Sequence, residues 1–176
     1  MPGENETPEY LAEQAAKGDE ACFITLCGVL KQKLFRTAKG VLGDEALALD
    51  AVSEAVFRAF RGIRRLRQPK YAETWFIRIL LNAANDLRRR QKNEIVMETV
   101  PESVYYDNHS ELNFSWMIGS LQPELREIIS LKYYSGYTLN EISVILDIPE
   151  GTVKSRLNRA LNLLRRQQVG REVSDE

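Results

Sequence analysis

The sequence contains few of the side chains that carry enzyme chemistry. Its 176 residues include one histidine, His109, and two cysteines, Cys22 and Cys27. It has no nucleophile motif, no phosphate-binding glycine loop and no group of residues with metal-ligand spacing. The cysteines lie five positions apart in a helical pattern, which fits neither a disulfide framework nor a C-x-x-C metal pair, so we expect buried free thiols. We therefore expect no catalytic residue, no metal, no cofactor and no enzymatic activity.

Long hydrophobic runs are also missing. No apolar stretch approaches the roughly 18 residues that a membrane span requires. The N-terminal segment 1–10 is acidic and polar, unlike a signal peptide. We expect a cytoplasmic protein that does not insert into the membrane, with a length that suits one ordinary domain or two small ones.

The net charge of −1 hides a strongly uneven distribution of charge. Basic residues are concentrated between Arg58 and Lys92 and again between Lys154 and Arg166. Acidic residues gather at the N-terminus and in the segment 93–111, which has five acids and no lysine or arginine. Two basic patches on two modules indicate two anion-binding surfaces, although a solvated helix face would explain either patch alone.

The apolar residues recur with helical spacing and no segment alternates with period two, which predicts an all-α fold. Helices are expected over about 8–17, from the region of Phe23 to Gly43, from Asp44 onward, and from about Glu73 to the arginines at 88–90. The buried face of the third helix is predicted to contain Leu49, Val52, Val56, Ala59, Phe60 and Ile63. The fourth helix is predicted to bury Phe76, Ile79, Leu80, Ala83 and Leu87.

The helical pattern fades over 93–111, which predicts a flexible acidic linker between a first domain at 8–92 and a second at 112–168. In the second domain, Pro123 suits the first turn of a helix that ends before Gly136. Thr138 and Glu141 form a capping-box pattern for a short helix. A turn at 147–149 then leads into a basic helix that runs to about residue 167, and the pair has the form of a helix-turn-helix DNA reader.

The last helix has two distinct faces. Apolar residues from Val153 to Leu164 share one side, which suits packing on the preceding helices. The opposite side can reach base edges and phosphates in a major groove, with a charged solvent face as the alternative. We call this side the recognition face; it consists of Thr152, Ser155, Asn158, Arg159 and Asn162, together with the flanking Lys154 and Arg156.

The third helix has an outward side that combines acidic, aromatic and basic residues. Asp50, Glu54, Phe57 and Arg61 recur there with helical spacing. An aromatic residue among charges on an exposed face is typical of a protein-docking surface, which we call the docking face. The alternative is that Phe57 packs on the first helix.

The fourth helix carries a second unusual side, which we call the base face: Trp75, Arg78, Asn82, Asn85 and Arg89. An aromatic ring, amides and arginines together can hold unstacked bases by stacking and by edge hydrogen bonds. The loop 66–73 lies next to this face in sequence and could help to trap a flipped base. A structural role for Trp75 is the alternative.

From Phe23 to Arg166 the chain resembles bacterial sigma-70 factors of the extracytoplasmic-function (ECF) group. The segment "LFRTAKGVLGDEALALDAVSEAVFRAFRGI" resembles regions 2.1–2.2 of that family, and "TWFIRILLNAANDLRRR" resembles regions 2.3–2.4. The segment from Leu121 to Arg166 resembles region 4. The resemblance implies a region 2 helical bundle and a region 4 helix-turn-helix, and an alternative sigma factor that directs transcription initiation in a stress response.

The resemblance also implies roles for individual residues. Docking on the β′ clamp helices of core RNA polymerase falls to Asp50, Glu54, Phe57 and Arg61. Recognition and melting of the −10 element falls to Gln68, Lys70, Tyr71, Trp75, Arg78, Asn82, Asp86, Arg88, Arg89 and Arg90. Binding of the −35 element falls to Thr152, Lys154, Ser155, Arg156, Asn158 and Arg159. Two positions depart from the family pattern, because Ser53 replaces a usual glutamine and Asn158 an often larger residue.

The implied partners are core RNA polymerase, through its β′ clamp helices and β flap, promoter DNA, and an anti-sigma factor of the membrane-tethered kind. The residues by themselves leave two other hypotheses open. One is a stand-alone helix-turn-helix regulator that binds duplex DNA without polymerase. The other is a small nuclease, against which the lack of clustered acids or histidines argues.

Overall fold

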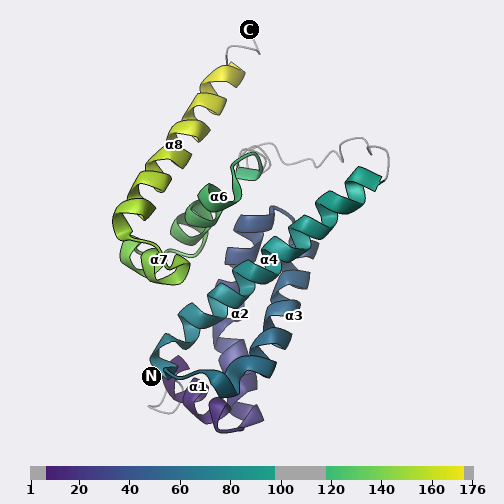
Figure 1. Ribbon diagram of the computed structural model, residues 1–176, viewed down its shortest axis with the longest axis vertical. Coiled ribbons are helices and arrows are strands. Elements are labelled where there is room, and N and C mark those ends of the chain that lie inside the picture. Colours follow the sequence, from purple (N-terminus) through teal and green to yellow (C-terminus); the bar gives the residue numbers. More distant parts are fainter. Residues whose placement is uncertain (1–6, 98–117, 173–176) are drawn as a thin grey trace.

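The computed structural model describes residues 7–97 and 118–172, and within these ranges every regular element is helical, as predicted (Figure 1). Side chains are described for 7–91 and 118–167. The first module consists of α1 (Pro8–Ala16), α2 (Glu20–Leu42), α3 (Glu45–Gly62) and α4 (Ala72–Met97), with short 3₁₀ turns η2 (Ile63–Arg65) and η3 (Pro69–Tyr71) between α3 and α4. The second module contains α6 (Pro123–Ile129), a π-helical turn η4 (Ser130–Tyr134), α7 (Leu139–Leu146) and α8 (Glu150–Glu172).

Local sequence signals set the ends of the helices in the first module. The side chains of Thr7, Asp19 and Asp44 each accept a hydrogen bond from a backbone N–H in the first turn of α1, α2 and α3. These bonds satisfy donors that a helix start leaves unpaired. Gly43 ends α2 in the left-handed conformation with φ 74°, which a residue without a Cβ adopts at little cost.

The buried face of α3 differs from the prediction. Leu49 is 53% exposed and Phe60 is 46% exposed, so both predicted core positions lie at the surface. Ala59 and Ile63 are buried as predicted, and Val52 and Val56 are half-buried. Most of the buried face is a ridge of fully buried alanines: Ala48, Ala51, Ala55 and Ala59. Small side chains let α3 approach α2 and α4 closely. The helical spacing of large apolar residues instead points to the neighbouring side of α3, which carries Leu49 and Phe60.

Helix α4 is longer than predicted. It was expected to end at the arginines 88–90 and continues to Met97, into the segment expected to be linker. Its core positions Phe76, Leu80 and Ala83 are fully buried as predicted, whereas Ile79 and Leu87 are half-buried. The rest of the expected linker, and the start of the second domain at Leu112, lie outside the described residues.

The helix-turn-helix forms as the capping pattern predicts. The Thr138 side chain accepts a hydrogen bond from the Glu141 N–H, and the Glu141 carboxylate accepts one from the Thr138 N–H at 2.7 Å. Asp147 ends α7 in the left-handed region with φ 54°, which turns the chain into α8. Val153 and Ala160 on α8 are fully buried, which aims the opposite side of this helix at solvent.

A buried arginine that no sequence motif predicted connects the start of the second module to α6. Arg126 is 2% exposed, and its guanidinium donates to the carbonyl oxygens of Ile118, Gly119 and Leu121. Three backbone acceptors compensate the burial of the charge.

The two modules pack against each other, with α6 and α7 beside α2 and α4 (Figure 1). Their apolar residues form one continuous cluster that runs from Leu11 to Leu164. Among the described helices, none is long and apolar enough to cross a membrane.

Candidate functional site

The docking face is exposed along α3. Phe57 is 56% exposed and carries the guanidinium of Arg61 over its ring, with 5.6 Å from the guanidinium carbon to the ring centroid. Asp50 is also exposed, and the Glu54 side chain retains 41% of its accessible surface. The alternative in which Phe57 packs on α1 does not fit this exposure. The face therefore exposes an aromatic ring and two carboxylates to solvent.

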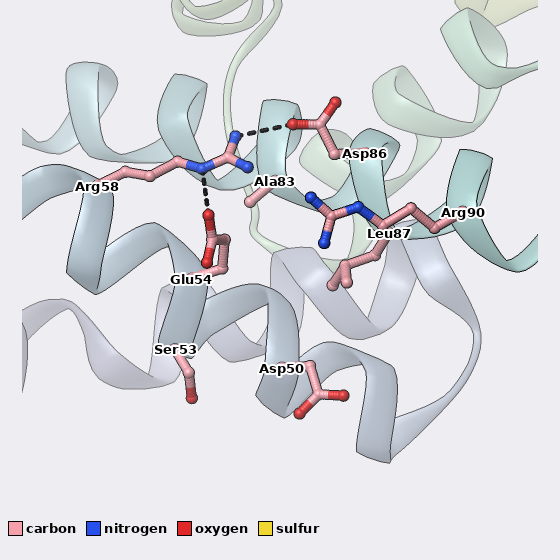
Figure 2. Close-up of a pocket in the computed structure, with 8 residues that line it drawn as sticks. All are labelled: Asp50, Ser53, Glu54, Arg58, Ala83, Asp86, Leu87 and Arg90. Atoms are coloured by element: carbon pink, nitrogen blue, oxygen red, sulfur yellow. Dashed lines mark hydrogen bonds and ion pairs between the residues drawn. The ribbon is translucent and has the colours of Figure 1, made fainter.

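A hollow of about 330 Å³ lies beside this face and is lined by residues of both α3 and α4 (Figure 2). Arg58 lies across it and holds a carboxylate on each side. Its Nε donates to Glu54 at 2.7 Å, and its Nη1 donates to Asp86 at 2.9 Å. Asp86 also pairs with Arg89. The hollow is lined by Asp50, Ser53, Glu54, Arg58, Ala83, Asp86, Leu87 and Arg90.

These contacts shift the pKa values of Asp86 and Arg58 so that the charged form of each group is favoured. Hydrogen bonds from Arg58 and then Arg89 lower the pKa of Asp86 below its ordinary value. Hydrogen bonds to Glu54 and then Asp86 raise the pKa of Arg58. Asp86 is thus held ionised and oriented on the side of α4 that faces α3. Arg58 was not among the predicted site residues, although its i,i+4 spacing from Glu54 was a usable signal.

The base face divides into two parts in the structure. Trp75 and Asn82 lie on the α3 side of α4, where they line a second hollow of about 280 Å³. Gly62 allows this arrangement, because a Cβ on it would lie 3.3 Å from the Trp75 ring. The hollow thus joins an aromatic ring, an amide and cations; its lining residues are Arg58, Gly62, Arg65, Trp75, Ile79 and Asn82.

The other part of the base face contacts the second module. The Nε of Arg78 donates to the Ile145 carbonyl oxygen at 2.9 Å, and the Nδ2 of Asn85 donates to Glu127 at 2.6 Å. Arg88, which is half-buried, lies 3.4 Å from the Gly119 carbonyl oxygen, and burial lowers its pKa. Arg89 and Arg90 remain exposed. The side chains that were predicted to share one face therefore point to two different neighbours.

The connection between α3 and α4 presents a polar edge near this site. Gln68, Lys70 and Tyr71 are all exposed. The Lys70 ammonium lies 4.7 Å from the centroid of the Tyr71 ring. A ring and a cation at this edge can contact a base and a phosphate.

The recognition face on α8 is accessible. Lys154, Ser155, Asn158 and Arg159 are exposed, and Thr152 and Arg156 are half-buried. The Ser155 hydroxyl donates to the Thr152 carbonyl oxygen at 3.0 Å, so its own oxygen can still accept a hydrogen bond. Cations and short polar side chains at the start of a helix after a tight turn suit contact with DNA phosphates and base edges.

The residues considered for other chemistry do not converge on a site. Cys22 and Cys27 are free and half-buried rather than fully buried, and burial raises the pKa of the Cys27 thiol to about 11. His109 lies outside the described residues. Within residues 7–91 and 118–167, no three His, Cys, Asp or Glu side chains form a group that could hold a metal ion.

The geometry describes a two-module, all-helical protein with an exposed acidic–aromatic face on α3, a hollow lined by Trp75 and Asn82 on α4, and an exposed cationic face on α8. Comparison with known proteins identifies its family. The family described as sigma-70 region 2 matches residues 29–94, and that described as sigma-70, region 4 matches residues 117–166. The chain belongs to the sigma-70 family of RNA polymerase sigma factors, and its curated relatives place it in the ECF group.

Two of these relatives come from Bacillus subtilis. The chain is 30% identical to the ECF RNA polymerase sigma factor SigW over 174 residues, covering 88% of this chain and 93% of SigW. It is 29% identical to the RNA polymerase sigma factor SigV over 161 residues, covering 88% of this chain and 96% of SigV.

Solved structures share the fold. CnrH, in complex with the cytosolic domain of CnrY, superposes with a TM-score of 0.72 at 23% identity, covering 93% of this chain and 97% of CnrH. RpoE of Bartonella quintana, in complex with the anti-sigma factor NepR, gives a TM-score of 0.66 at 21% identity, covering 82% of this chain and 94% of RpoE.

Proposed function

We propose that this chain is an alternative sigma factor that binds core RNA polymerase and directs initiation at promoters defined by −35 and −10 elements. The observation that carries the proposal is the pairing of surfaces on the first module. An exposed acidic–aromatic docking face on α3 adjoins a Trp75–Asn82 hollow on α4, and the recognition face lies on the second module. A stand-alone regulator has no use for the first two surfaces.

Docking on core polymerase is assigned to α3. Asp50 and Glu54 offer carboxylates to cations of the β′ clamp helices, and Phe57 supplies an apolar anchor of the kind that dominates interfaces. Arg61 lies over the Phe57 ring and orients it. The second module contacts the β flap.

Promoter opening is assigned to the α3–α4 side of the first module. The Trp75 ring provides a stacking surface, and Asn82 offers an amide to the edge of an unstacked base. Gln68, Lys70 and Tyr71 hold a flipped base from the neighbouring turn. Phosphate contacts come from the arginines at the middle of α4: Arg78, Arg88, Arg89 and Arg90. Asp86 orients Arg89 through their ion pair.

Binding of the −35 element is assigned to the recognition face on α8. Lys154 and Arg156 suit phosphate contacts, whereas Ser155, Asn158 and Arg159 suit the base edges of a major groove. Thr152 lies at the start of the helix, where a phosphate is also favoured. This module positions the complex upstream of the melted segment.

We infer that an anti-sigma factor controls this chain. The solved structures of CnrH and RpoE, which share its fold, were both obtained with a bound partner, and this supports the inference. The proposed anti-sigma factor is membrane-tethered and covers both modules, and the released protein acts in the cytoplasm, where core polymerase is.

Run-off transcription with core polymerase tests the proposal. A set of ECF-type promoters is transcribed with and without the purified chain, and a promoter-specific transcript that requires both the chain and core enzyme is expected. A mobility-shift assay without polymerase is run in parallel, in which weak, salt-sensitive binding is expected because each cationic surface is small. Tight binding of a palindromic duplex without polymerase, together with no transcript, would identify a stand-alone regulator, and metal-dependent cleavage of the DNA would identify a nuclease.

A further inference from the structure

The Arg58 side chain lies where three hollows of the first module meet. It lines the first hollow together with Glu54 and Asp86, and the second hollow together with Trp75 and Asn82. It also lines a third hollow of about 340 Å³, whose other lining residues are Arg61, Gly62 and Arg65. Arg58 therefore adjoins both the docking face on α3 and the hollow on α4 that is assigned to an unstacked base.

Two carboxylates fix the Arg58 guanidinium between α3 and α4 (Figure 2). Glu54 accepts from Nε at 2.7 Å, and Asp86 accepts from Nη1 at 2.9 Å. Asp86 also pairs with Arg89, so two carboxylates and two guanidinium groups cancel one another in a single network. A planar guanidinium suits this bridge, because it donates to two acceptors in different directions at once.

This network is too exposed for folding to be its main effect. The side chains of Arg58 and Asp86 retain 31% and 28% of their accessible surface, and that of Arg89 retains 77%. Ion pairs with this exposure add little to the free energy of unfolding, because solvent screens them. The network therefore acts mainly through the charge that it presents to neighbouring surfaces.

The neighbouring surface is the hollow lined by Trp75 and Asn82. Asp86 follows Asn82 by one turn of α4, a spacing at which the two Cβ atoms lie about 5–6 Å apart. A strand whose base enters this hollow places its own phosphates within about 10 Å of Asp86, the Debye length at about 0.1 M salt. A free carboxylate at position 86 would repel that strand, whereas a carboxylate bound by Arg58 and Arg89 does not.

We propose that Arg58 is a positioning residue for promoter opening. It cancels the charge of Asp86 and holds this carboxylate beside Arg89, so the side of α4 that receives the unstacked strand presents no free anion. Asp86 then contacts its two arginines and no base. Without Arg58, the carboxylates of Glu54 and Asp86 share Arg89 as the one remaining cation of the network. The inference rests on the assignment of α4 to promoter opening under "Proposed function"; the ion-pair network itself does not.

Charge cancellation predicts a specific pattern of rescue. Arg58→Gln leaves an excess of negative charge beside the hollow. Adding Asp86→Asn to Arg58→Gln removes that excess, so the double variant is expected to recover most of what the single variant loses. Arg58→Lys keeps the positive charge and should retain more function than Arg58→Gln. Arg36→Gln is the matched loss of one cation, because Arg36 is exposed on α2 and belongs to no proposed surface.

Each full-length variant is measured in two ways, after its melting temperature has been compared with that of the unsubstituted chain. With saturating core polymerase, permanganate footprinting measures the opening of a promoter selected by run-off transcription. Without polymerase, fluorescence anisotropy measures the affinity for a single-stranded dT12 probe. Arg58→Gln is expected to lose several-fold in both, and its deficit in dT12 affinity should shrink as salt is raised, because salt screens the repulsion. Arg36→Gln should match the unsubstituted chain in both.

Three results would overturn the proposal. The first is full opening and full dT12 affinity of Arg58→Gln. The second is a double variant that is no better than Arg58→Gln, since Asp86 would then have a direct contact of its own. The third is a markedly lower melting temperature of Arg58→Gln, since the network would then be structural. An unsubstituted chain that opens no promoter with core enzyme counts against the sigma function instead, and the dT12 comparison then still tests charge cancellation by Arg58.

Discussion

At the scale of single residues, Glu54 and Asn82 allow two proposed roles of the first module, polymerase docking and promoter opening, to be tested separately. Glu54 shares Arg58 with Asp86 and still exposes 41% of its side chain toward solvent. Asn82 is exposed on the next helix and lines the hollow under Trp75. Neither side chain is part of the apolar core, so substitution of either is expected to change function more than stability.

Glu54→Lys is expected to weaken binding to core polymerase by about tenfold or more, because it reverses a charge in the docking face. The cost to folding is small, since the Glu54–Arg58 pair is partly exposed and joins positions four apart on one helix. A fluorescence titration against core enzyme measures the affinity. Glu13→Lys, an equal charge reversal on exposed α1, should bind like the unsubstituted chain; equal loss in both variants would contradict the docking face.

Asn82→Ala is expected to impair promoter opening more than initial promoter binding, because the amide contacts a base only after the strands separate. Permanganate footprinting measures opening, and heparin-sensitive closed complexes measure binding. Asn158→Ala is the matched amide on the recognition face and should reduce closed complexes first. A parallel loss of both signals in the Asn82 variant would show that this side chain has a structural role.

At the scale of elements, α3 shows how a helix can bury its smallest residues. Its alanine ridge faces α2 and α4, and larger residues such as Leu49 and Phe60 lie outside it. Phe60 still contacts Phe23 edge to face, with ring centroids 5.3 Å apart. Close approach of α3 and α4 is what brings Arg58 within reach of Asp86, so the packing of the element positions the charges of the site.

Ala55→Leu is expected to destabilise the protein by about 1–3 kcal/mol, because Ala55 is fully buried and the added carbons have no space between the helices. Leu49→Ala removes a larger side chain but an exposed one, and is expected to change stability by less than about 1 kcal/mol. Urea unfolding followed by circular dichroism measures both. A larger loss of stability for the Leu49 variant than for the Ala55 variant would support the buried face that the sequence pattern predicted.

At the scale of the whole molecule, the contact between the modules places the half-buried carboxyl group of Glu127 against Asn85 on α4. Burial raises the pKa of Glu127 above its ordinary value of 4.5, while the hydrogen bond from Asn85 and the charge of Arg156 oppose this rise and Glu124 adds to it. The folded state therefore favours the protonated form of Glu127. Its contribution to stability is complete below pH 4.5 and is lost as the pH rises through the raised pKa.

Glu127→Gln is expected to raise the melting temperature at pH 7 and to change it little near pH 4.5, because glutamine stays neutral and still accepts the bond from Asn85. Differential scanning calorimetry between pH 4.5 and 8 measures the effect. Glu124→Gln is the control on the same helix. Glu124 is exposed in the first turn, where its charge favours the helix, so its removal should not raise the melting temperature. A lower melting temperature for Glu127→Gln at pH 7 would contradict this account.

The sequence by itself determined the all-α class, the helix caps and the capping box of the helix-turn-helix, because these depend on contacts between residues three or four apart. Asp44, Gly43 and Thr138 act where their types predict. Region 4 of the family was also recognisable, since its apolar and cationic faces repeat along one helix.

Only the tertiary structure decided which residues meet across helices. The bridge from Arg58 to Asp86 spans 28 positions, and the bond from Arg78 to Ile145 spans 67. No local pattern specifies such pairs, because they depend on how closely α3 approaches α4 and on where the second module docks. For the same reason the residues predicted to share a single face of α4 lie on two sides, one toward α3 and the other toward α6 and α7.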